Sequence, residues 1–241
     1  KLTGPEAEGF GQLWLEWTSE RVLEIVDRMV ALCEEQPDVE FEAIYKQGLT
    51  HPNTSVRLSA LRGLEESGDR ALIAPLSNML LNDPSVEVRA ASAVPLTYLS
   101  AMAQEKKLGS KDGVVLSRVL YGVLDDEREV QDVKLKALEA VSVFGGDRLA
   151  SYIESTASSS DISALKSSLF AMGRSSDPRW IENVLPNLEH DVASIRYEAS
   201  MAMGELGEEE HLRALEVPLD DADLTVQLAA SLPKRKMATA K

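Results

Sequence analysis

Three histidines are the side chains of this sequence best suited to bind a metal ion or to move protons: His51, His190 and His211. A catalytic metal centre needs several His, Cys or carboxylate ligands at close spacing. Glu189-His190 and Glu210-His211 place a carboxylate beside an imidazole, but both pairs fall in predicted turns without a third ligand at metal spacing. We therefore interpret the histidines as loop or capping residues.

The rest of the sequence contains no recognisable catalytic constellation. There is no glycine-rich phosphate loop, no nucleophile elbow and no Cys/His pair, and Gly145-Gly146 is interpreted as a turn. The single cysteine, Cys33, lies in an apolar helical pattern and is interpreted as packing. One thiol excludes an intrachain disulfide and suits a reducing cytoplasm. We expect a cytoplasmic protein that is not an enzyme and has no catalytic residue, cofactor or metal.

A pattern about 30 residues long recurs from near residue 50 to the end of the chain. In each copy an aliphatic residue precedes an anchor, which is basic in the first five copies and glutamine in the last. The anchors are Arg57, Arg89, Lys134, Lys166, Arg196 and Gln227, at steps of 32, 45, 32, 30 and 31 residues. A fixed period of this size is typical of a stacked-repeat solenoid.

Each copy is predicted to contain two helices. The second carries the anchor, with apolar residues at offsets −1, +3, +4 and +7 from it, as in Val56, Ala60, Leu61 and Leu64, which share one helical face. The first helices are expected within residues 72–81, 114–124, 149–153, 180–188 and 212–219. No alternating strand pattern occurs, so the chain is predicted to be all-α.

Helix ends are predicted from Asp, Pro and Gly. The pairs Asp83-Pro84 and Asp177-Pro178 are typical of an N-cap followed by proline at the first helical position. Gly68, Gly146 and Gly207 lie just past second helices, where glycine supplies the left-handed conformation that ends a helix.

The repeated sequence resembles HEAT repeats, in particular the short bacterial form similar to phycobilisome-lyase HEAT-like repeats. The resemblance is carried by the segments 73–76, 82–91 and 199–207 and covers residues 41–232. It implies a right-handed α-α superhelix of about six helix pairs, an armadillo-like solenoid. It also implies that each anchor pairs with an acidic residue of a neighbouring repeat, for which the candidates are Asp83, Asp161, Asp191 and Asp221.

This chain lacks the functional residues of enzymes that are built from similar repeats. The His-Glu pairs of deoxyhypusine hydroxylases are absent, and no catalytic residue of bilin lyases can be carried over. Trp180 with Asp177 and Arg179 is similar to the tryptophan and aspartate of alkylpurine DNA glycosylases, which act through a basic surface. This chain has a net charge of −15, which disfavours nucleic acid and anionic membranes. No stretch of 18 apolar residues is present that could span a membrane.

The two ends and one internal segment depart from the repeat. Residues 1–40 are predicted to form a helical cap over the first repeat; the alternative is a partner-binding or self-association helix. Its apolar face contains Val22, Ile25, Val26, Met29, Val30 and Cys33. Residues 233–241 are predicted to form a basic, disordered tail, and the start at Lys1 is compatible with removal of an upstream segment. Pro95 is expected to kink its helix, and a polar loop is expected from Ser100 to Gly113.

The predicted function is a non-catalytic scaffold that binds a protein or peptide along its concave face. Offsets +2 and +5 from each anchor should face away from the core. The predicted partner-binding residues are Ser59, Arg62, Val94, Tyr98, Lys136, Glu139, Tyr197, Glu198 and Met201, together with Ala91, Ser168 and Ala171.

Two alternatives remain open. The acidic clusters at 125–127, 208–210 and 220–221 are either solvated turns and helix caps or a rim that attracts a basic partner. The alternative function is a lyase-like or chaperone-like accessory factor that acts on a chromoprotein or metalloprotein.

Overall fold

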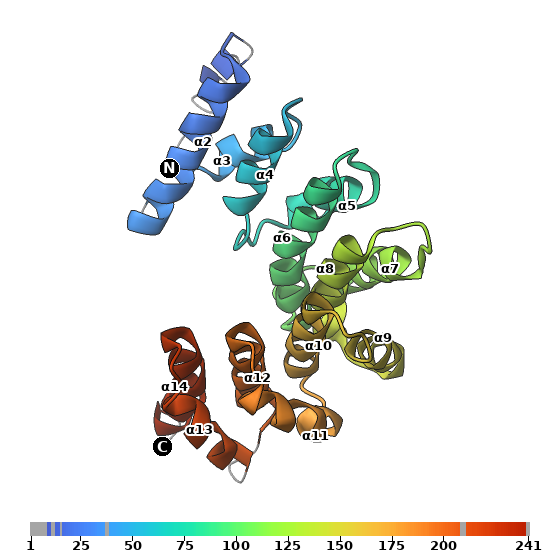
Figure 1. Ribbon diagram of the computed structural model, residues 1–241. Coiled ribbons are helices and arrows are strands. Elements are labelled where there is room, and N and C mark those ends of the chain that lie inside the picture. The colour runs from blue at the N-terminus through green and yellow to red at the C-terminus, as the bar shows by residue number, and fades with distance from the viewer. Residues whose placement is uncertain (1–8, 11–12, 15, 37–38, 208–210, 240–241) are drawn as a thin grey trace. The chain divides into compact units, whose positions relative to one another are not determined.

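The computed structural model describes residues 9–10, 13–14, 16–36, 39–207 and 211–239 and is helical throughout, with no strand in these ranges (Figure 1). The prediction of an all-α chain is therefore confirmed. The chain divides into two compact units, residues 1–140 and residues 141–241. The domain boundaries predicted at residues 40 and 232 stay predictions.

In the first unit, helical hairpins follow one another along the chain. Helix α3 packs on α4 and α5 packs on α6, while α2, α4 and α6 contact in sequence. Helix α7 lies against both α5 and α6. The elements are α2 (Ser19–Glu35), α3 (Glu42–Gly48), α4 (Thr54–Arg62), η1 (Arg70–Leu72), α5 (Ile73–Asn82), α6 (Val86–Gln104), α7 (Asp112–Asp125) and α8 (Gln131–Val141).

The second unit repeats this arrangement. Its second helices α10, α12 and α14 pack in order, and each contacts the first helix of its own pair. The elements are η2 (Ser142–Phe144), α9 (Asp147–Ala157), α10 (Ile162–Ser175), η3 (Pro178–Trp180), α11 (Ile181–Val184), η4 (Leu185–Glu189), α12 (Ala193–Leu206), η5 (His211–Leu215), α13 (Glu216–Leu219) and α14 (Leu224–Thr239).

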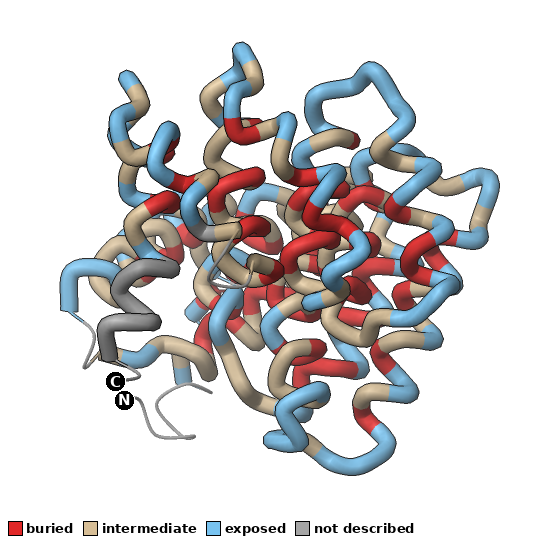
Figure 2. Tube along the Cα trace, turned by 90° about the horizontal axis from the view of Figure 1, so that it is seen from below, coloured by how far each residue is buried: buried red, intermediate tan, exposed pale blue. Residues whose placement is uncertain are grey.

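Buried segments are spread through the helices (Figure 2), and the predicted core positions are buried in four of the second helices, α4, α6, α8 and α12. In α4 and the turn that follows it, Val56, Ala60, Leu61 and Leu64 have at most 1% of their surface exposed. The same offsets are buried in α6, α8 and α12, where they hold the residues Val88, Ser92, Ala93, Leu96, Val133, Ala137, Leu138, Val141, Ile195, Ala199, Ser200 and Met203. The three- and four-residue spacing therefore identifies the packed face correctly in these helices.

Helix α10 follows the same pattern, but its register differs from the predicted one by one residue. Its buried side chains lie at Ala164, Ser168, Leu169 and Met172, which are offsets −1, +3, +4 and +7 from Leu165. Leu165 rather than Lys166 thus occupies the anchor position, and the last three steps between anchors all become 31 residues. The prediction that Ser168 and Ala171 face away from the core is wrong, because both are fully buried.

Four of the six anchor side chains share a local role, which is to hold the turn that leads into their own helix. Arg57 donates a hydrogen bond to the carbonyl of the residue six positions earlier, at 2.9 Å. Arg89, Arg196 and Gln227 make the same contact six positions back, at 2.9, 2.7 and 2.6 Å. Gln227 therefore replaces the basic anchor without loss of this bond.

Three arginine anchors also bind a carboxylate that lies just before the next second helix. Arg57 holds Asp83, Arg89 holds Glu129 and Arg196 holds Asp221, each through two parallel hydrogen bonds. Asp83 and Asp221 are thus confirmed as partners, while Glu129 was not among the candidates. Such fork-to-carboxylate pairs fix geometry as well as charge. They tie one hairpin to the next.

The other two candidate partners, Asp161 and Asp191, have local roles. The side chain of Asp161 caps α10 by accepting a hydrogen bond from the backbone N–H of Ser163, at 3.1 Å. Asp191 contributes its backbone carbonyl, which accepts from Arg196 at 3.0 Å.

Half of the segment predicted as a long loop from Ser100 to Gly113 is helical. Helix α6 runs through Pro95 as one element to Gln104, and α7 begins at Asp112, so only residues 105–111 connect them. Ser100 is fully buried. The predicted loop is therefore too long, because residues 100–104 continue the packed helix.

Several helix ends also differ from prediction. Ser85 rather than Asp83 caps α6, and it accepts from the backbone N–H of Val88, whereas Asp177 caps η3 as expected. Of the three glycines predicted to end helices only Gly146 has a positive φ, 91°, and it is the N-cap of α9; Gly207 has φ of −73°. Helix α14 continues to Thr239, so helix is assigned to residues 233–239, where the sequence predicts a disordered tail.

Helix α2 covers one side of α4. Thr18 caps it by accepting from the backbone N–H of Arg21. Val22, Val26 and Val30 are its buried residues, whereas Ile25 and Met29 are half-buried. The contact with α4 fits the predicted cap, with a buried face centred on the three valines.

Candidate functional site

A groove in the first unit brings together several of the predicted surface residues. It lies along α4, between α2 and α6, and encloses an empty volume of about 810 Å³ that is open to solvent. We call it the α4 groove; its lining residues are Leu23, Asp27, Ser55, Leu58, Ser59, Leu61, Arg62, Glu65, Ala91 and Val94. Among them are Ser59, Arg62, Ala91 and Val94, which stand at offsets +2 and +5 of their repeats. The prediction that Ser59 faces away from the core is wrong, because it is 6% exposed and bonded to α2.

The lining of the α4 groove combines apolar side chains with three charged ones, Asp27, Arg62 and Glu65. Asp27 of α2 accepts a hydrogen bond from the hydroxyl of Ser59 at 2.5 Å, and the guanidinium of Arg62 lies 4.0 Å from the same carboxylate. Burial raises the pKa of Glu65, an effect that Arg62 opposes and the nearby carboxylates Glu66 and Glu34 reinforce. Asp27, Arg62 and Glu65 therefore give the groove charges of both signs.

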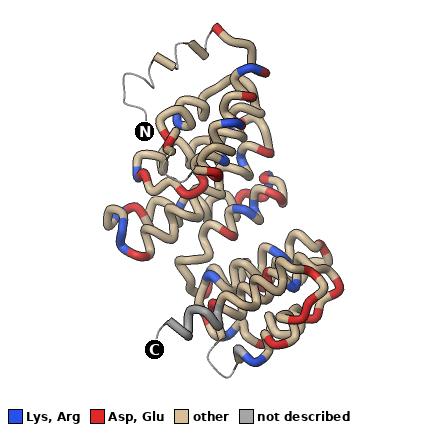
Figure 3. Tube along the Cα trace, turned by 90° about the vertical axis from the view of Figure 1, so that its left-hand side faces the viewer, with Lys and Arg blue, Asp and Glu red and all other residues tan. Residues whose placement is uncertain are grey.

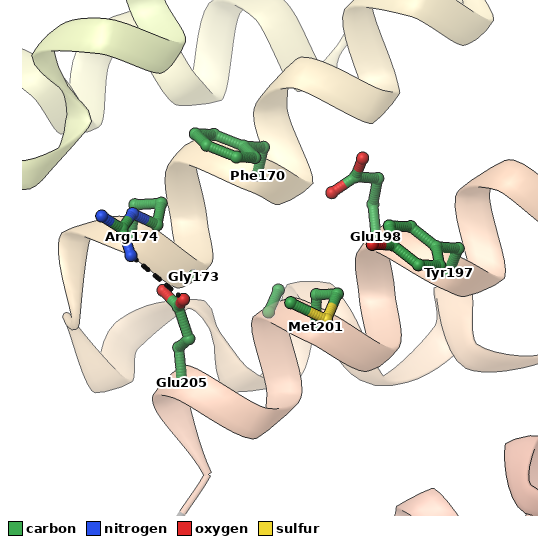
Figure 4. A pocket seen from close by; sticks show the side chains of 8 residues that line it. Phe170, Gly173, Arg174, Tyr197, Glu198, Met201 and Glu205 are labelled. Carbon is green, nitrogen blue, oxygen red and sulfur yellow. Dashed lines mark hydrogen bonds and ion pairs between the residues drawn. The ribbon is translucent and has the colours of Figure 1, made fainter. Parts of the chain in front are cut away.

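A second hollow lies in the other unit, between α10 and α12 (Figure 4). We call it the α10–α12 pocket; its lining residues are Phe170, Gly173, Arg174, Tyr197, Glu198, Met201, Ala202 and Glu205, and its empty volume is about 420 Å³. The aromatic ring of Phe170 on α10 stands opposite Tyr197 and Met201 on α12. These three side chains form an apolar surface between α10 and α12.

Ion pairs close both ends of the α10–α12 pocket. Arg174 lies 3.3 Å from Glu205 at one end, and Lys166 lies 3.8 Å from Glu198 at the other. Both pairs join α10 to α12, and their side chains remain partly exposed, except that Glu198 is mostly covered. The pocket thus offers an apolar centre with a charged rim of mixed sign, which suits a peptide side chain rather than a highly charged ligand.

The floor of this pocket depends on a close approach of the two helices. A Cβ atom added at Gly173 would lie 2.7 Å from the Cα of Ala202, which is closer than real contacts allow. Only glycine on α10 lets the helices approach this closely. Small side chains at the crossing leave the larger ones at Phe170 and Met201 to line the opening.

The remaining predicted residues lie outside both hollows. Tyr98 on α6 is 42% exposed. Lys136 and Glu139 on α8 form an ion pair with each other at 2.8 Å. Sequence reasoning missed Leu23 and Asp27 because α2 is not a repeat, and it missed Phe170 because of the one-residue error in α10. In the corrected register Phe170 is at offset +5, equivalent to Val94 and Met201.

Two of the three histidines lie in turns that precede second helices, which fits the loop role expected of them. The Nδ1 atom of His51 accepts from the backbone N–H of Asn53 at 3.1 Å, and that of His190 accepts from Val192 at 3.0 Å. Burial lowers the pKa of His51. Across the part of the chain that the structure describes, no group of three or more His, Cys, Asp or Glu side chains could hold a metal ion.

The charges of the described residues are interleaved along the backbone (Figure 3). The acidic cluster at 208–210 lies outside the described residues. Within those residues, no helix combines the length and the apolar character needed to cross a membrane.

No protein-family model matches the chain, and no curated protein matches it. Among solved structures, YibA of Escherichia coli has a TM-score of 0.49 at 14% identity, over 99% of this chain and 80% of that one. An engineered protein has a TM-score of 0.45 at 19% identity, over 82% and 96% of the two chains. A chain from the structural study of microtubule plus-end tracking by XMAP215, CLIP-170 and EB1 has 0.37 at 16%, over 80% and 89%. At these scores the likeness identifies neither a family nor a function.

Proposed function

We propose that this chain is a non-catalytic scaffold that binds a protein or peptide through the solvent-facing sides of its second helices. The observation that carries the proposal is the repeated placement of the lining residues. Arg62, Val94, Phe170 and Met201 occupy the same offset in four repeats, and each of them lines a hollow. A ligand with its own regular spacing, such as an extended or helical peptide, matches a surface built in this way.

The expected partner presents both apolar and basic side chains to this surface. Its apolar residues would cover Val94 and Leu58 in the α4 groove or Phe170 and Met201 in the α10–α12 pocket. A lysine or arginine beside Glu65 would stabilise the charged form of that carboxylate, whose pKa burial raises. The net charge of −15 also favours a basic partner, and it disfavours nucleic acid and anionic membranes.

The finer architecture belongs to the same proposal. We expect the hairpins to form a right-handed α-α superhelix of six helix pairs, of the HEAT-like type similar to phycobilisome-lyase repeats, with α2 as its cap. The single cysteine favours a reducing cytoplasm as the compartment.

Affinity capture with matched surface variants tests the function. Val94→Asp and Met201→Asp place a charge in each hollow, and Val114→Asp places the same charge on α7 at a residue that is 56% exposed. We expect the wild type and Val114→Asp to capture the same protein from the native host, with capture reduced at least tenfold by one of the other two variants. All three variants should keep the wild-type melting temperature within a few degrees.

Equal capture by all the variants would contradict a binding role for the two hollows. If the captured protein carries a coloured or metal cofactor, the accessory-factor alternative replaces the simple scaffold. Absorbance of the purified complex distinguishes these two outcomes.

A further inference from the structure

The α4 groove is about as wide as one helix. Helix α4 packs against α2 on one side and against α6 on the other, and residues of all three helices line the groove. Packed helices lie about 8–10 Å apart, so α4 forms the floor and its two neighbours form the walls. A helix with its side chains is about 10–12 Å across. A fourth helix laid along α4 can therefore contact the side chains of both walls.

Four apolar side chains of the lining are only half-buried and leave apolar surface open in the groove. They are Leu23 on α2, Leu58 on α4, and Ala91 and Val94 on α6. Apolar side chains that converge from the floor and both walls match the apolar stripe of an amphipathic helix, whose residues recur at steps of three and four.

Asp27 is a carboxylate held in position on the α2 wall. Its Oδ1 atom accepts a hydrogen bond at 2.5 Å from the hydroxyl of Ser59, a residue that is 6% exposed. Its Oδ2 atom accepts no hydrogen bond from the described residues, and the aspartate side chain is 47% exposed. The guanidinium of Arg62 lies 4.0 Å away, which is beyond hydrogen-bond distance. Asp27 can therefore accept a hydrogen bond from a further cation.

The groove is more negative toward the C-terminal ends of α2 and α4. Burial raises the pKa of Glu65, and Arg62 lowers it. The nearby carboxylates Glu66 and Glu34 raise it further. With Asp27, four carboxylates thus lie near the guanidinium of Arg62. The ends of the two helices add partial negative charge, so this end of the groove is complementary to a positively charged ligand.

We propose that the α4 groove binds one basic amphipathic helix of a partner protein, with a lysine or arginine beside Asp27 and another beside Glu65. This inference rests on the proposed function and specifies the chemistry of the partner at one of the two hollows. Ser59, which holds Asp27, precedes Glu65 by six residues, or roughly 9 Å along α4 at about 1.5 Å per residue. Basic residues seven positions apart in a ligand helix lie about 10.5 Å apart on one face. Apolar residues between them would cover Val94.

Other ligands fit this lining less well. An acidic or phosphorylated peptide would bring its charge toward Glu34, Glu65 and Glu66 and would be repelled. An uncharged helix would remove water from carboxylates without pairing them, which costs free energy. An extended strand needs backbone hydrogen-bond partners, and the backbone groups of α2, α4 and α6 are bonded within their own helices.

Fluorescence anisotropy of labelled peptides with the full chain tests the proposal. Three helical peptides of about 18 residues share one apolar stripe and carry lysine, glutamine or glutamate at two positions seven residues apart. The lysine peptide should bind the wild type at least about tenfold more tightly than the glutamate peptide. Glu65→Lys should weaken binding of the lysine peptide about tenfold and strengthen binding of the glutamate peptide. Asp27→Asn, which keeps an oxygen for the Ser59 hydroxyl, should also weaken binding of the lysine peptide.

Glu127→Lys is the matched control, because it makes the same change of charge at an exposed residue between α7 and α8, outside the groove. It should leave the affinity for the lysine peptide within about twofold of wild type. Equal weakening by Glu127→Lys and Glu65→Lys would overturn the proposal, and so would equal affinities for the three peptides or no binding of the lysine peptide to the wild type. Circular dichroism melting establishes that each variant is folded.

The same peptides separate this inference from the proposed function. Host capture that is reduced by Val94→Asp or Met201→Asp, together with no binding of the lysine peptide, would reject the basic helix and keep the scaffold. Peptide binding that depends on Asp27 and Glu65, together with equal host capture by all the surface variants, would keep the groove as a helix-binding site and reject capture of the host protein through the hollows.

Discussion

Arg57 on α4 and Asp83 before α6 form a buried ion pair with two parallel hydrogen bonds, each of 2.9 Å, that joins one helical hairpin to the next. Only 9% of the arginine side chain and 7% of the aspartate side chain are exposed. The guanidinium also donates to the carbonyls of His51 and Pro52, so it holds the turn before its own helix as well. One residue thus fixes the geometry both within and between repeats.

Removing the acidic partner should therefore be costly. Asp83→Ala leaves the Arg57 guanidinium buried without a carboxylate, for which the expected destabilisation is about 3–5 kcal/mol. Urea unfolding at neutral pH measures it. The control is Glu24→Ala, which removes an exposed ion pair with Arg21 on α2 and should cost no more than about 1 kcal/mol. Similar losses for the two variants would show that the buried pair does not hold the hairpins together.

The free energy of unfolding should fall in acid because the carboxylates of such arginine–carboxylate pairs become protonated. Hydrogen bonds from Arg196 lower the pKa of Asp221, and hydrogen bonds from Arg89 lower the pKa of Glu129. A carboxylate whose pKa is lower in the folded state stabilises the fold fully above its unfolded pKa, which is about 4, and loses that effect as the pH falls through the folded pKa. The raised pKa of Glu65 acts in the opposite direction and offsets part of this loss.

The measurement is the free energy of unfolding in urea between pH 7 and pH 3. The wild type should lose stability as the pH falls below about 4.5, where the first of these groups begins to protonate. Asp221→Asn should be less stable at pH 7 and should show a smaller decrease in acid. An unchanged acid slope in this variant would show that Asp221 does not contribute to acid unfolding.

Gln227 provides a direct test of the local role of the anchor. Its side-chain amide donates to the carbonyl of Asp221 at 2.6 Å, as the arginines do in other repeats. Gln227→Leu should destabilise the second unit by about 1–2 kcal/mol because that carbonyl loses its donor. Gln227→Arg restores a donor of the kind used elsewhere and should remain within about 1 kcal/mol of wild type, as measured by thermal melting. Equal effects of both substitutions would show that Gln227 does not stabilise the unit by donating this hydrogen bond.

The N-terminal helix should stabilise the first repeat. Deletion of residues 1–36 removes Val22, Val26 and Val30, whose burial against α4 contributes roughly 1.5–3 kcal/mol each. We expect the shortened protein to aggregate or to melt much earlier in scanning calorimetry, because its loss is comparable to the total stability of a small domain. A soluble, equally stable protein that has only lost self-association would instead make α2 an interaction helix.

The periodic features of the fold could be predicted from the sequence because they depend on local spacing. Apolar residues at steps of three and four specify the packed face of each second helix, and this succeeded for α4, α6, α8 and α12. It failed in α10, where Leu165-Lys166 imitates the aliphatic-basic signature of an anchor although Leu165 itself takes the anchor position. The register is determined by which side chains along the whole helix are buried, and not by this one dipeptide.

The candidate site was predictable in part for the same reason. Offsets from a correctly placed anchor identified Ser59, Arg62, Val94 and Met201 among the lining residues. Asp27 and Glu129 could not be identified in this way, because their contacts depend on how distant segments pack. The loop predicted at 100–113 begins too early because a polar residue such as Ser100 can be buried in a helix against neighbours that sequence spacing does not reveal.

Site-specific photo-crosslinking in the native host tests the binding surface most directly. A photoreactive phenylalanine analogue at Val94 or Met201 should give a covalent adduct with one defined partner at one or both positions. The same analogue at Val114 on α7 or Val217 on α13, which are 56% and 60% exposed, should give none. Adducts confined to Val114 and Val217, or no defined adduct from Val94 and Met201, would contradict the assignment of the binding surface to the second helices.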